Sequence, residues 1–256
     1  MGARLDQHFL IDPAVADTIV AAARIEPDDS VLEIGPGRGV LTKLLLAQAK
    51  QVTVVEMDDR LAATLQGRLC SPANLQLVHA DFLKVNMDSL GAQQVKIVSN
   101  LPYSVATPIL QNLLKWPRWD SAVLMFQKEV AERIIAVPGS GDYGLLTLSV
   151  LLYAEAELVC EVGRRSFSPP PKVGSAVVRL LRRAQPLIAP DKEAAFFKVA
   201  KAAFAQRRKM AAGPISSTLG LVRKKVDAAF EVLGIPPGAR AENIPLEAWL
   251  KLPELL

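Results

Sequence analysis

The chain has 256 residues, half of them hydrophobic, which is enough to bury a substantial core. No apolar run reaches the ~18–20 residues that a membrane helix needs, and the first ten residues contain no apolar signal-peptide core. We therefore expect an unsecreted, cytoplasmic protein without membrane contacts. Cys70 and Cys160 lie far apart and lack metal-ligand spacing, so the sequence supports neither a disulfide framework nor a metal site.

The net charge of +4 is unevenly distributed along the chain. Residues 1–163 contain 13 lysines and arginines against 19 aspartates and glutamates, a balance of −6, whereas residues 164–256 contain 17 against 7, a balance of +10. Charge runs are most often solvated helix faces, but an asymmetry over a whole segment favours nucleic acid binding. Two clusters have the spacing to contact successive phosphates: Arg207, Arg208, Lys209 and Arg223, Lys224, Lys225.

The first predicted element is a helix over residues 13–24, because Asp12 can cap its first amides and Pro13 fits a first helical turn. Short apolar runs then alternate with amphipathic stretches, a pattern typical of a doubly wound α/β sheet with helices on both faces. In the predicted helix Thr107–Leu114, Thr107 is the cap and Pro108 is the first helical residue. The predicted strands are Val31–Ile34, Val52–Glu56, Leu75–His79, Val95–Ser99 and Ala122–Phe126, and the predicted helices are Gly39–Ala49, Asp59–Leu69 and Thr107–Leu114.

The pattern changes in the second half of the chain, where two helical stretches precede two strands that we expect to form an antiparallel pair at one sheet edge. Beyond Pro186 only helical spacing remains, with breaks at Gly213-Pro214 and Pro236-Pro237-Gly238. These later elements are Gln127–Val137, Tyr143–Tyr153, Leu158–Val162, Val173–Leu181 and residues 192–204, 223–233 and 246–252. We therefore expect a sheet domain over residues 1–184 and a small, basic, helical domain over residues 185–256.

A glycine-rich turn follows the first predicted strand. The run Gly35-Pro36-Gly37-Arg38-Gly39 leads into a helix, a geometry that brings backbone amides against a ligand. A dinucleotide fingerprint would place its third glycine at position 40, which is Val40, and this weakens the alternative of a nicotinamide-dependent dehydrogenase. A tight turn without any ligand is the structural alternative for this motif alone.

Two carboxylates follow the next two predicted strands. Glu56 lies about 20 residues after Gly35, where an acidic side chain can accept hydrogen bonds from ribose hydroxyls. Asp81 follows the third strand and can accept a hydrogen bond from an adenine amino group. Each carboxylate alone is more often a helix cap, but three consecutive parallel strands bring both to the sheet edge that Gly35 occupies. Together they predict a site for an adenosine-containing ligand.

The fourth predicted strand ends in Ser99-Asn100-Leu101-Pro102-Tyr103, which resembles the Asn-x-Pro-Tyr motif of amino-group methyltransferases. With Leu at its second position, the motif is similar to that of the rRNA adenine dimethyltransferase family. Other segments resemble this family in order along nearly the whole chain: Gln7-His8-Phe9-Leu10, Glu33 to Gly37, Val55-Glu56-Met57-Asp58, Gln127 to Val130, Phe167 to Val177, Ala205 to Lys209 and Arg240 to Asn243. The chain resembles the bacterial small-subunit branch more than the antibiotic-resistance methyltransferases of large-subunit rRNA.

The resemblance implies a class I, Rossmann-like methyltransferase with a seven-stranded, mostly parallel sheet and a helical C-terminal domain. It implies methyl transfer from S-adenosylmethionine to N6 of two adjacent adenines near the 3′ end of small-subunit (16S) rRNA, in the pre-30S particle, and we expect a monomer. It assigns the cofactor to His8, Leu10, Gly35, Gly37, Glu56, Met57, Asp81, Phe82 and Asn100, the catalytic site to Asn100, Leu101, Tyr103 and Phe167, and the RNA to the two basic clusters.

The chemistry explains why these residue types are suitable. An exocyclic adenine amine is a poor nucleophile, because its lone pair is delocalised into the ring. The Asn100 side-chain oxygen and the Leu101 carbonyl, placed by the resemblance, accept hydrogen bonds from this amine and localise the pair through preorganised electrostatics. Tyr103 and Phe167 can hold the faces of an unstacked base.

The chain departs from the family at two positions. His8 stands where Asn is usual, so a cofactor contact there relies on different atoms, and Met210 follows the Gln-Arg-Arg-Lys run where Thr is usual. Two alternatives remain open: a large-subunit rRNA adenine methyltransferase, and a non-catalytic assembly factor that binds rRNA. The intact Gly35, Glu56, Asp81 and Asn100 argue against the non-catalytic assembly factor.

Overall fold

The computed structural model describes residues 7–90 and 93–256, and its contacts separate two compact units. Unit 1 comprises residues 1–131 and Glu155–Arg182, and unit 2 comprises Glu132–Ala154 and Arg183–Leu256. The chain leaves unit 1 close to the boundary that the sequence predicts after residue 184. Residues 132–154, which we expected in the sheet domain, instead group with the C-terminal helices.

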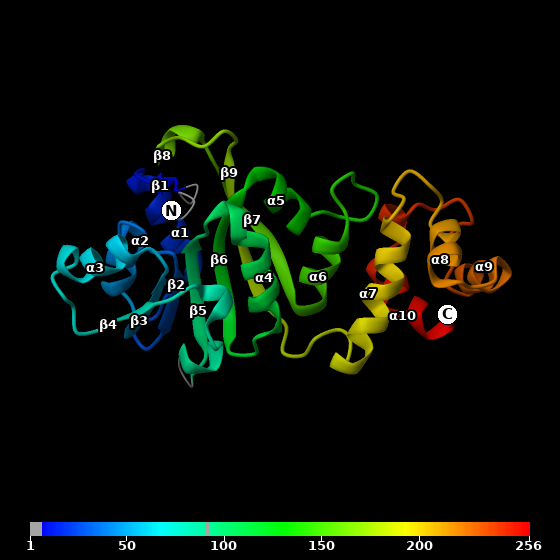
Figure 1. Ribbon diagram of the computed structural model, residues 1–256, viewed down its shortest axis with the longest axis horizontal. Coiled ribbons are helices and arrows are strands. Elements are labelled where there is room, and N and C mark those ends of the chain that lie inside the picture. The colour runs from blue at the N-terminus through cyan, green and yellow to red at the C-terminus, as the bar shows by residue number, and fades with distance from the viewer. Residues whose placement is uncertain (1–6, 91–92) are drawn as a thin grey trace. The chain divides into compact units, whose positions relative to one another are not determined.

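The main sheet has seven strands in the order β4-β3-β2-β5-β6-β9-β7 (Figure 1). The first five are joined by parallel ladders, and β9 pairs antiparallel with β6. This confirms the mostly parallel, Rossmann-like sheet. The bounds are β2 Ser30–Ile34, β3 Gln51–Glu56, β4 Leu75–His79, β5 Val95–Asn100, β6 Trp119–Gln127, β7 Ala154–Val162 and β9 Ser175–Arg182.

Helices pack on this sheet through apolar residues of alternating strand positions. Asp12 caps α1 by accepting from the amides of Ala14 and Val15, as predicted. Buried residues of α1 and α2 share one core with Val52, Val54 and other alternate strand residues. In the described part of the chain, no helix is both long and apolar enough for a membrane crossing. The bounds are α1 Pro13–Ala23, α2 Val40–Leu46, α3 Asp59–Arg68, α4 Ala106–Lys115 and α5 Lys128–Ile134.

Unit 2 is helical and has a core of its own. Tyr143 and Leu148 are fully buried in one cluster with Phe196 and Trp249, which explains why α6 groups with the C-terminal helices. The helices are α6 Leu145–Tyr153, α7 Pro190–Phe204, α8 Ala212–Leu219, α9 Arg223–Val232 and α10 Leu246–Leu255.

Two details of the predicted helices are wrong. The helix α4 begins at Ala106 after a 3₁₀ turn, η3 Tyr103–Val105, and no side chain caps it, so Thr107 is not its cap. The helix α8 includes Gly213 and Pro214, which the sequence analysis treated as a break. Proline is tolerated there because the first helical turn does not need its amide.

The sheet opens between β2 and β5. The strands β3 and β4 lie on the β2 side of this point, and β6, β9 and β7 lie on the β5 side. Only Val31 and Leu32 pair with β5, whereas every residue of β2 pairs with β3. Beyond these pairs, the hydroxyl of Ser99 donates to the carbonyl of Ile34 at 2.5 Å. Open α/β sheets bind ligands at such a point, outside the carboxyl ends of the strands.

Gly39→Ala should destabilise unit 1. Gly39 precedes α2 with a φ of +83°, and a Cβ there would lie 3.0 Å from Leu65 Cδ1, in the buried core. The left-handed backbone and the overpacking together predict a loss of about 1–3 kcal/mol in the free energy of unfolding, measured by urea titration. Gly67→Ala is the matched control, since a Cβ at this position of α3 meets nothing within 4 Å. Equal stability of the Gly39→Ala variant and the unmodified protein would contradict the packing described.

Candidate functional site

A pocket lies at the carboxyl ends of β2, β3, β4 and β5. It is lined by all the residues that the sequence predicts for the cofactor: His8, Leu10, Gly35, Gly37, Glu56, Met57, Asp81, Phe82 and Asn100. Leu101 and Tyr103 also line it, and Phe167 contacts Tyr103 edge to face with ring centroids 6.5 Å apart. The fold therefore brings the predicted cofactor and catalytic residues together, and their individual roles stay predictions.

The glycine-rich turn is held by the strands around it. The Gly35 amide donates to the Val55 carbonyl at 2.8 Å, and the Gly37 amide donates to the Glu56 carboxylate at 3.1 Å. Gly35 and Gly37 have φ values of +67° and +58°, and a Cβ on Gly37 would lie 3.2 Å from the Phe9 ring. Glycine is therefore required here both by the backbone conformation and by space.

The two predicted carboxylates have structural partners as well. Glu56, 6% exposed, accepts from the amides of Gly37 and Asp58, and Asp81 accepts from the amide of Leu83. A carboxylate offers about four lone-pair sites, so each group can still accept hydrogen bonds from a ligand in the pocket. The capping role and the ligand-binding role are thus compatible.

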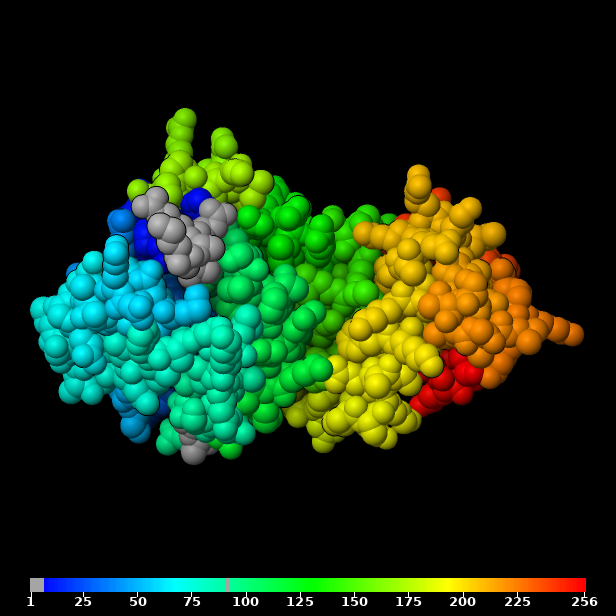
Figure 2. All heavy atoms as spheres, in the orientation of Figure 1, coloured from blue at the N-terminus to red at the C-terminus, as the bar shows by residue number. Residues whose placement is uncertain are grey.

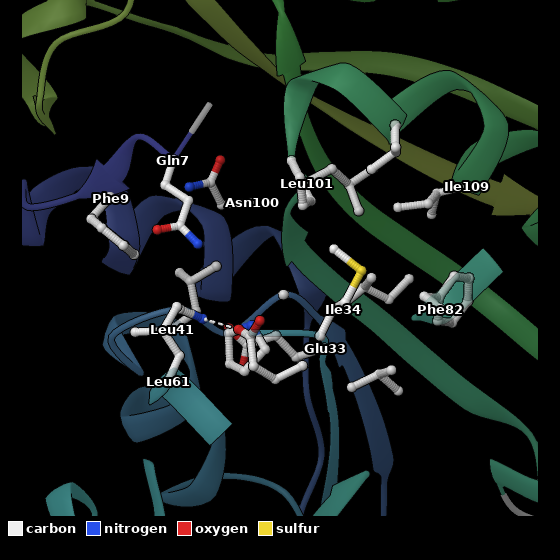
Figure 3. A pocket seen from close by; sticks show the side chains of 18 of the residues that line it. Gln7, Phe9, Glu33, Ile34, Leu41, Leu61, Phe82, Asn100, Leu101 and Ile109 are labelled. Atoms are coloured by element: carbon white, nitrogen blue, oxygen red, sulfur yellow. Dashed lines mark hydrogen bonds between the residues drawn. The ribbon is translucent and has the colours of Figure 1, made fainter. Parts of the chain in front are cut away.

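Apolar side chains form the walls between these carboxylates. Figure 3 shows Phe82 and Ile109 on one side of the pocket, and Phe9 and Leu41 on the other. Met57 also lines the pocket and is 44% exposed. Apolar walls with acceptors at their ends suit an adenosine, so the residues present fit S-adenosylmethionine.

A second group of contacts surrounds Asn100. Its side-chain amide donates to the His8 carbonyl at 3.5 Å, and the His8 ring stacks on Tyr103 with centroids 5.8 Å apart. The Tyr103 hydroxyl lies 2.6 Å from the hydroxyl of the buried Ser175, and burial raises the pKa of Tyr103. These contacts orient the Asn100 carboxamide and the Tyr103 ring.

His8 also joins two short strands that the sequence analysis missed. β1 (Phe9–Leu10) pairs antiparallel with β8 (Phe167–Ser168), and His8 Nδ1 lies 2.8 Å from the Pro169 carbonyl. Because a carbonyl only accepts, Nδ1 carries the proton in this contact. The pairing of β1 with β8 joins residues 157 and 159 positions apart and has no signature in the sequence.

Glu33 is a pocket residue that the site prediction omitted. It is 2% exposed and accepts from the Thr42 hydroxyl at 2.6 Å. Burial raises the pKa of Glu33 to about 8, against a smaller opposing effect of the Thr42 hydrogen bond, and the nearby Glu56 charge adds to the rise. An acidic residue at an apolar strand position was the available sequence signal.

The six residues predicted for RNA binding lie in unit 2, in the turn after α7 and in the first turn of α9. Arg207 donates to the carbonyls of Gly141 and Tyr143, Arg223 pairs with Asp227, and Lys225 contacts the Leu256 carbonyl. Arg208, Lys209 and Lys224 are exposed and have no partner among the described residues. The clusters are therefore only partly available to a polyanion.

Glu33→Gln should remove a pH dependence from stability. The carboxyl pKa is raised from 4.5 to about 8 on folding, so its stabilising contribution is complete below pH 4.5 and is lost as pH rises through 8. Between pH 4.5 and 8, each pH unit changes this contribution to the free energy of unfolding by up to ~1.4 kcal/mol. Urea unfolding between pH 5 and 8.5 should show the variant gaining stability relative to the unmodified protein as pH rises. Parallel curves would show that Glu33 ionises normally.

Comparisons with known proteins identify the family. The family described as "Ribosomal RNA adenine dimethylase" matches residues 2–256. The chain is 40% identical to "Ribosomal RNA small subunit methyltransferase A" of Dehalococcoides mccartyi, over 97% of this chain and 86% of that protein. A protein of the same name from Clostridium botulinum is also 40% identical, over 98% of this chain and 92% of its own length.

Two solved structures share the fold over the full length. A dimethyladenosine transferase from Plasmodium falciparum superposes with a TM-score of 0.82 at 30% identity, over 96% of both chains. The 23S rRNA methyltransferase ErmE superposes with a TM-score of 0.76 at 34% identity, over 97% of this chain and 99% of its own. The protein thus belongs to the ribosomal RNA adenine dimethylase family of S-adenosylmethionine-dependent methyltransferases.

Proposed function

We propose that the protein dimethylates N6 of two adjacent adenines near the 3′ end of small-subunit (16S) rRNA, as a cytoplasmic monomer acting on the pre-30S particle. The observation that supports this most strongly is the Asn100-Leu101-Pro102-Tyr103 turn at the carboxyl end of β5, in the same pocket as Glu56 and Asp81. The 40% identity to proteins named for the small subunit favours this substrate, against 34% to the large-subunit enzyme ErmE.

The cofactor roles follow from the chemistry of the pocket. Glu56 accepts hydrogen bonds from the ribose hydroxyls, and Asp81 accepts from the adenine amino group of the cofactor. Met57 and Phe82 hold the faces of that adenine, and the turn at Gly35 and Gly37 faces the remaining part, together with His8 and Leu10. When bound, S-adenosylmethionine supplies an electrophilic methyl group on a sulfonium.

Asn100 activates the target amine. Its side-chain nitrogen donates to the His8 carbonyl, so its oxygen is directed away from that contact and can accept from N6–H of adenine. The Leu101 carbonyl accepts the second N–H. A neutral carboxamide suits this role, since a carboxylate would also attract the sulfonium in the ground state and need not favour the transition state.

Tyr103 holds the extruded base. Its ring is fixed by the Ser175 hydroxyl and by the His8 ring, so little side-chain freedom is lost when a base stacks on it. Stacking of this kind contributes about 1–3 kcal/mol per base. Phe167 is 2% exposed and meets Tyr103 with its edge, so we assign it to supporting the Tyr103 ring rather than to contacting the base itself.

Methylation mapping tests the proposed substrate. Undermethylated small and large ribosomal subunits are incubated separately with the protein and methyl-labelled cofactor, and nucleosides are analysed by mass spectrometry. N6,N6-dimethyladenosine should form at two adjacent adenines near the 3′ end of 16S rRNA. Label confined to large-subunit RNA would favour the alternative represented by ErmE, and no label in either would leave the scaffold role.

Asn100→Ala and Glu56→Ala should separate catalysis from cofactor binding. Asn100→Ala removes the acceptor for the target amine, so turnover should fall by roughly 10²–10³-fold with cofactor affinity mostly unchanged. Glu56→Ala removes the ribose contact, so calorimetry should show a loss of roughly 1.5–3 kcal/mol in cofactor binding. Because Glu56→Ala also removes the hydrogen bond from the Gly37 amide, thermal unfolding of this variant is measured as a control for stability.

For the other variant, a fully active Asn100→Ala enzyme would disprove the assigned mechanism.

A further inference from the structure

Residues 164–256 have a net charge of +10, and half of this excess belongs to unit 1. The segment from residue 164 to residue 182 contains five basic residues and no acidic residue, whereas residues 183–256 contain 12 basic and 7 acidic residues. The five are Arg164, Arg165, Lys172, Arg179 and Arg182. The charge asymmetry is therefore not a property of the C-terminal helices alone.

Two of these five have internal roles. Arg179 is 9% exposed and pairs with Glu157 at 3.0 Å. Arg182 donates to the Leu114 carbonyl and lies over the Trp119 ring. The other three, Arg164, Arg165 and Lys172, are exposed and belong to one short segment, residues 163–172.

This segment is fixed beside the opening of the pocket. Within it, Ser168 and Phe167 pair with Phe9 and Leu10, and both of these N-terminal residues line the pocket. The Ser166 carbonyl accepts from the Ile11 amide at 2.9 Å, which extends the connection. Figure 1 places β8 beside β1, and Figure 2 shows that the yellow-green part of the chain projects from the surface.

Two carboxylates beside the segment already have partners. Asp12 caps α1 with one oxygen and accepts from the Ser166 hydroxyl with the other, and Glu161 pairs with Lys128 at 2.8 Å. In the described part of the chain, neither Arg164 nor Arg165 nor Lys172 has a carboxylate partner. Arg164 instead donates to the Lys172 carbonyl at 3.4 Å, which brings the two ends of the segment together.

Arg38 adds a fourth cation on the glycine-rich turn. It is exposed and stacks over the Phe9 ring, with its guanidinium carbon 4.4 Å from the ring centroid. Because Phe9 pairs with Ser168, this stacking places Arg38 at the pocket, next to the strand that β8 extends. In the described part of the chain none of the four cations is paired with a carboxylate, so their charge is available to a polyanionic ligand.

We propose that Arg38, Arg164, Arg165 and Lys172 form a phosphate-binding rim of unit 1, which holds the RNA backbone on either side of the target adenine. The inference rests on the proposed function, because a base extruded into the pocket leaves its flanking phosphates at the pocket opening. The rim acts on RNA independently of the basic clusters in unit 2. It determines whether the target nucleotide is held while the amine is methylated.

Arg164→Ala/Arg165→Ala tests the rim. Lys50→Ala/Arg68→Ala is the matched control, since it removes the same charge from exposed positions just before β3 and at the end of α3. Binding of a short single-stranded oligoribonucleotide with two adjacent adenines is measured across a salt series. The rim variant should lose at least tenfold in affinity, the equivalent of roughly 1.4 kcal/mol, and the slope of log K against log salt should flatten by about 0.7 per lost contact.

Other measurements separate the possible failures. The rim variant should keep its melting temperature and its cofactor affinity, while KM for small ribosomal subunits rises and kcat changes little. Arg208→Ala/Lys209→Ala in unit 2 should reduce affinity for intact subunits additively with it. If the rim variant showed the same slope of log K against log salt as the Lys50→Ala/Arg68→Ala control, the proposed phosphate-binding role would be wrong, even with methylation intact. If the unmodified protein binds RNA through the rim but methylates only large subunits, the rim stands and the proposed substrate fails.

Discussion

The pocket depends on one buried carboxylate. Glu56 ends β3 and accepts hydrogen bonds from the amides of Gly37 and Asp58, so a single side chain holds the glycine-rich turn and the start of α3 at fixed positions. A buried carboxylate is costly unless it is hydrogen-bonded, and these two amides satisfy part of its demand. The oxygens keep lone pairs for a ligand, and the same group can therefore both organise the pocket and recognise a ribose. Structural support and ligand recognition coincide in this residue.

The side of the pocket that we assign to the target base is built differently. Its residues come from β1, from the turn after β5 and from β8, which are distant in sequence and are joined by contacts of His8 with Asn100, Tyr103 and Pro169. The departure from the family's usual Asn therefore has a structural consequence. The His8 carbonyl positions the Asn100 amide, and the backbone of any residue could do this. The His8 ring stacks on Tyr103 and also bonds to the β8 segment. An Asn side chain could not make both of these contacts.

The two units divide the basic charge in a way that a count along the chain conceals. Arg207, Arg223 and Lys225 are held by partners within unit 2, so fewer charges of the two clusters remain for RNA than their spacing suggests. Conversely, the segment that contains Arg164 and Arg165 belongs to unit 1, because β8 pairs with β1. RNA contacts proposed for the two units are thus separable by mutation. Removing the chain beyond residue 185 would not separate them, since Tyr143 and Leu148 would lose their core partners.

Sequence alone predicted the mostly parallel sheet, the residues at the carboxyl ends of its strands and the family, because buried strands, helix caps such as Asp12, and motifs such as Asn100 to Tyr103 are local patterns. It also identified Glu56 and Asp81, since parallel strands bring their carboxyl ends to one edge. Only the tertiary structure decided that α6 belongs with the C-terminal helices, that Glu33 is a buried pocket residue with a raised pKa, and that the segment around Phe167 lies against β1. These features depend on burial and on pairing between distant residues, which leave no periodic trace in the chain.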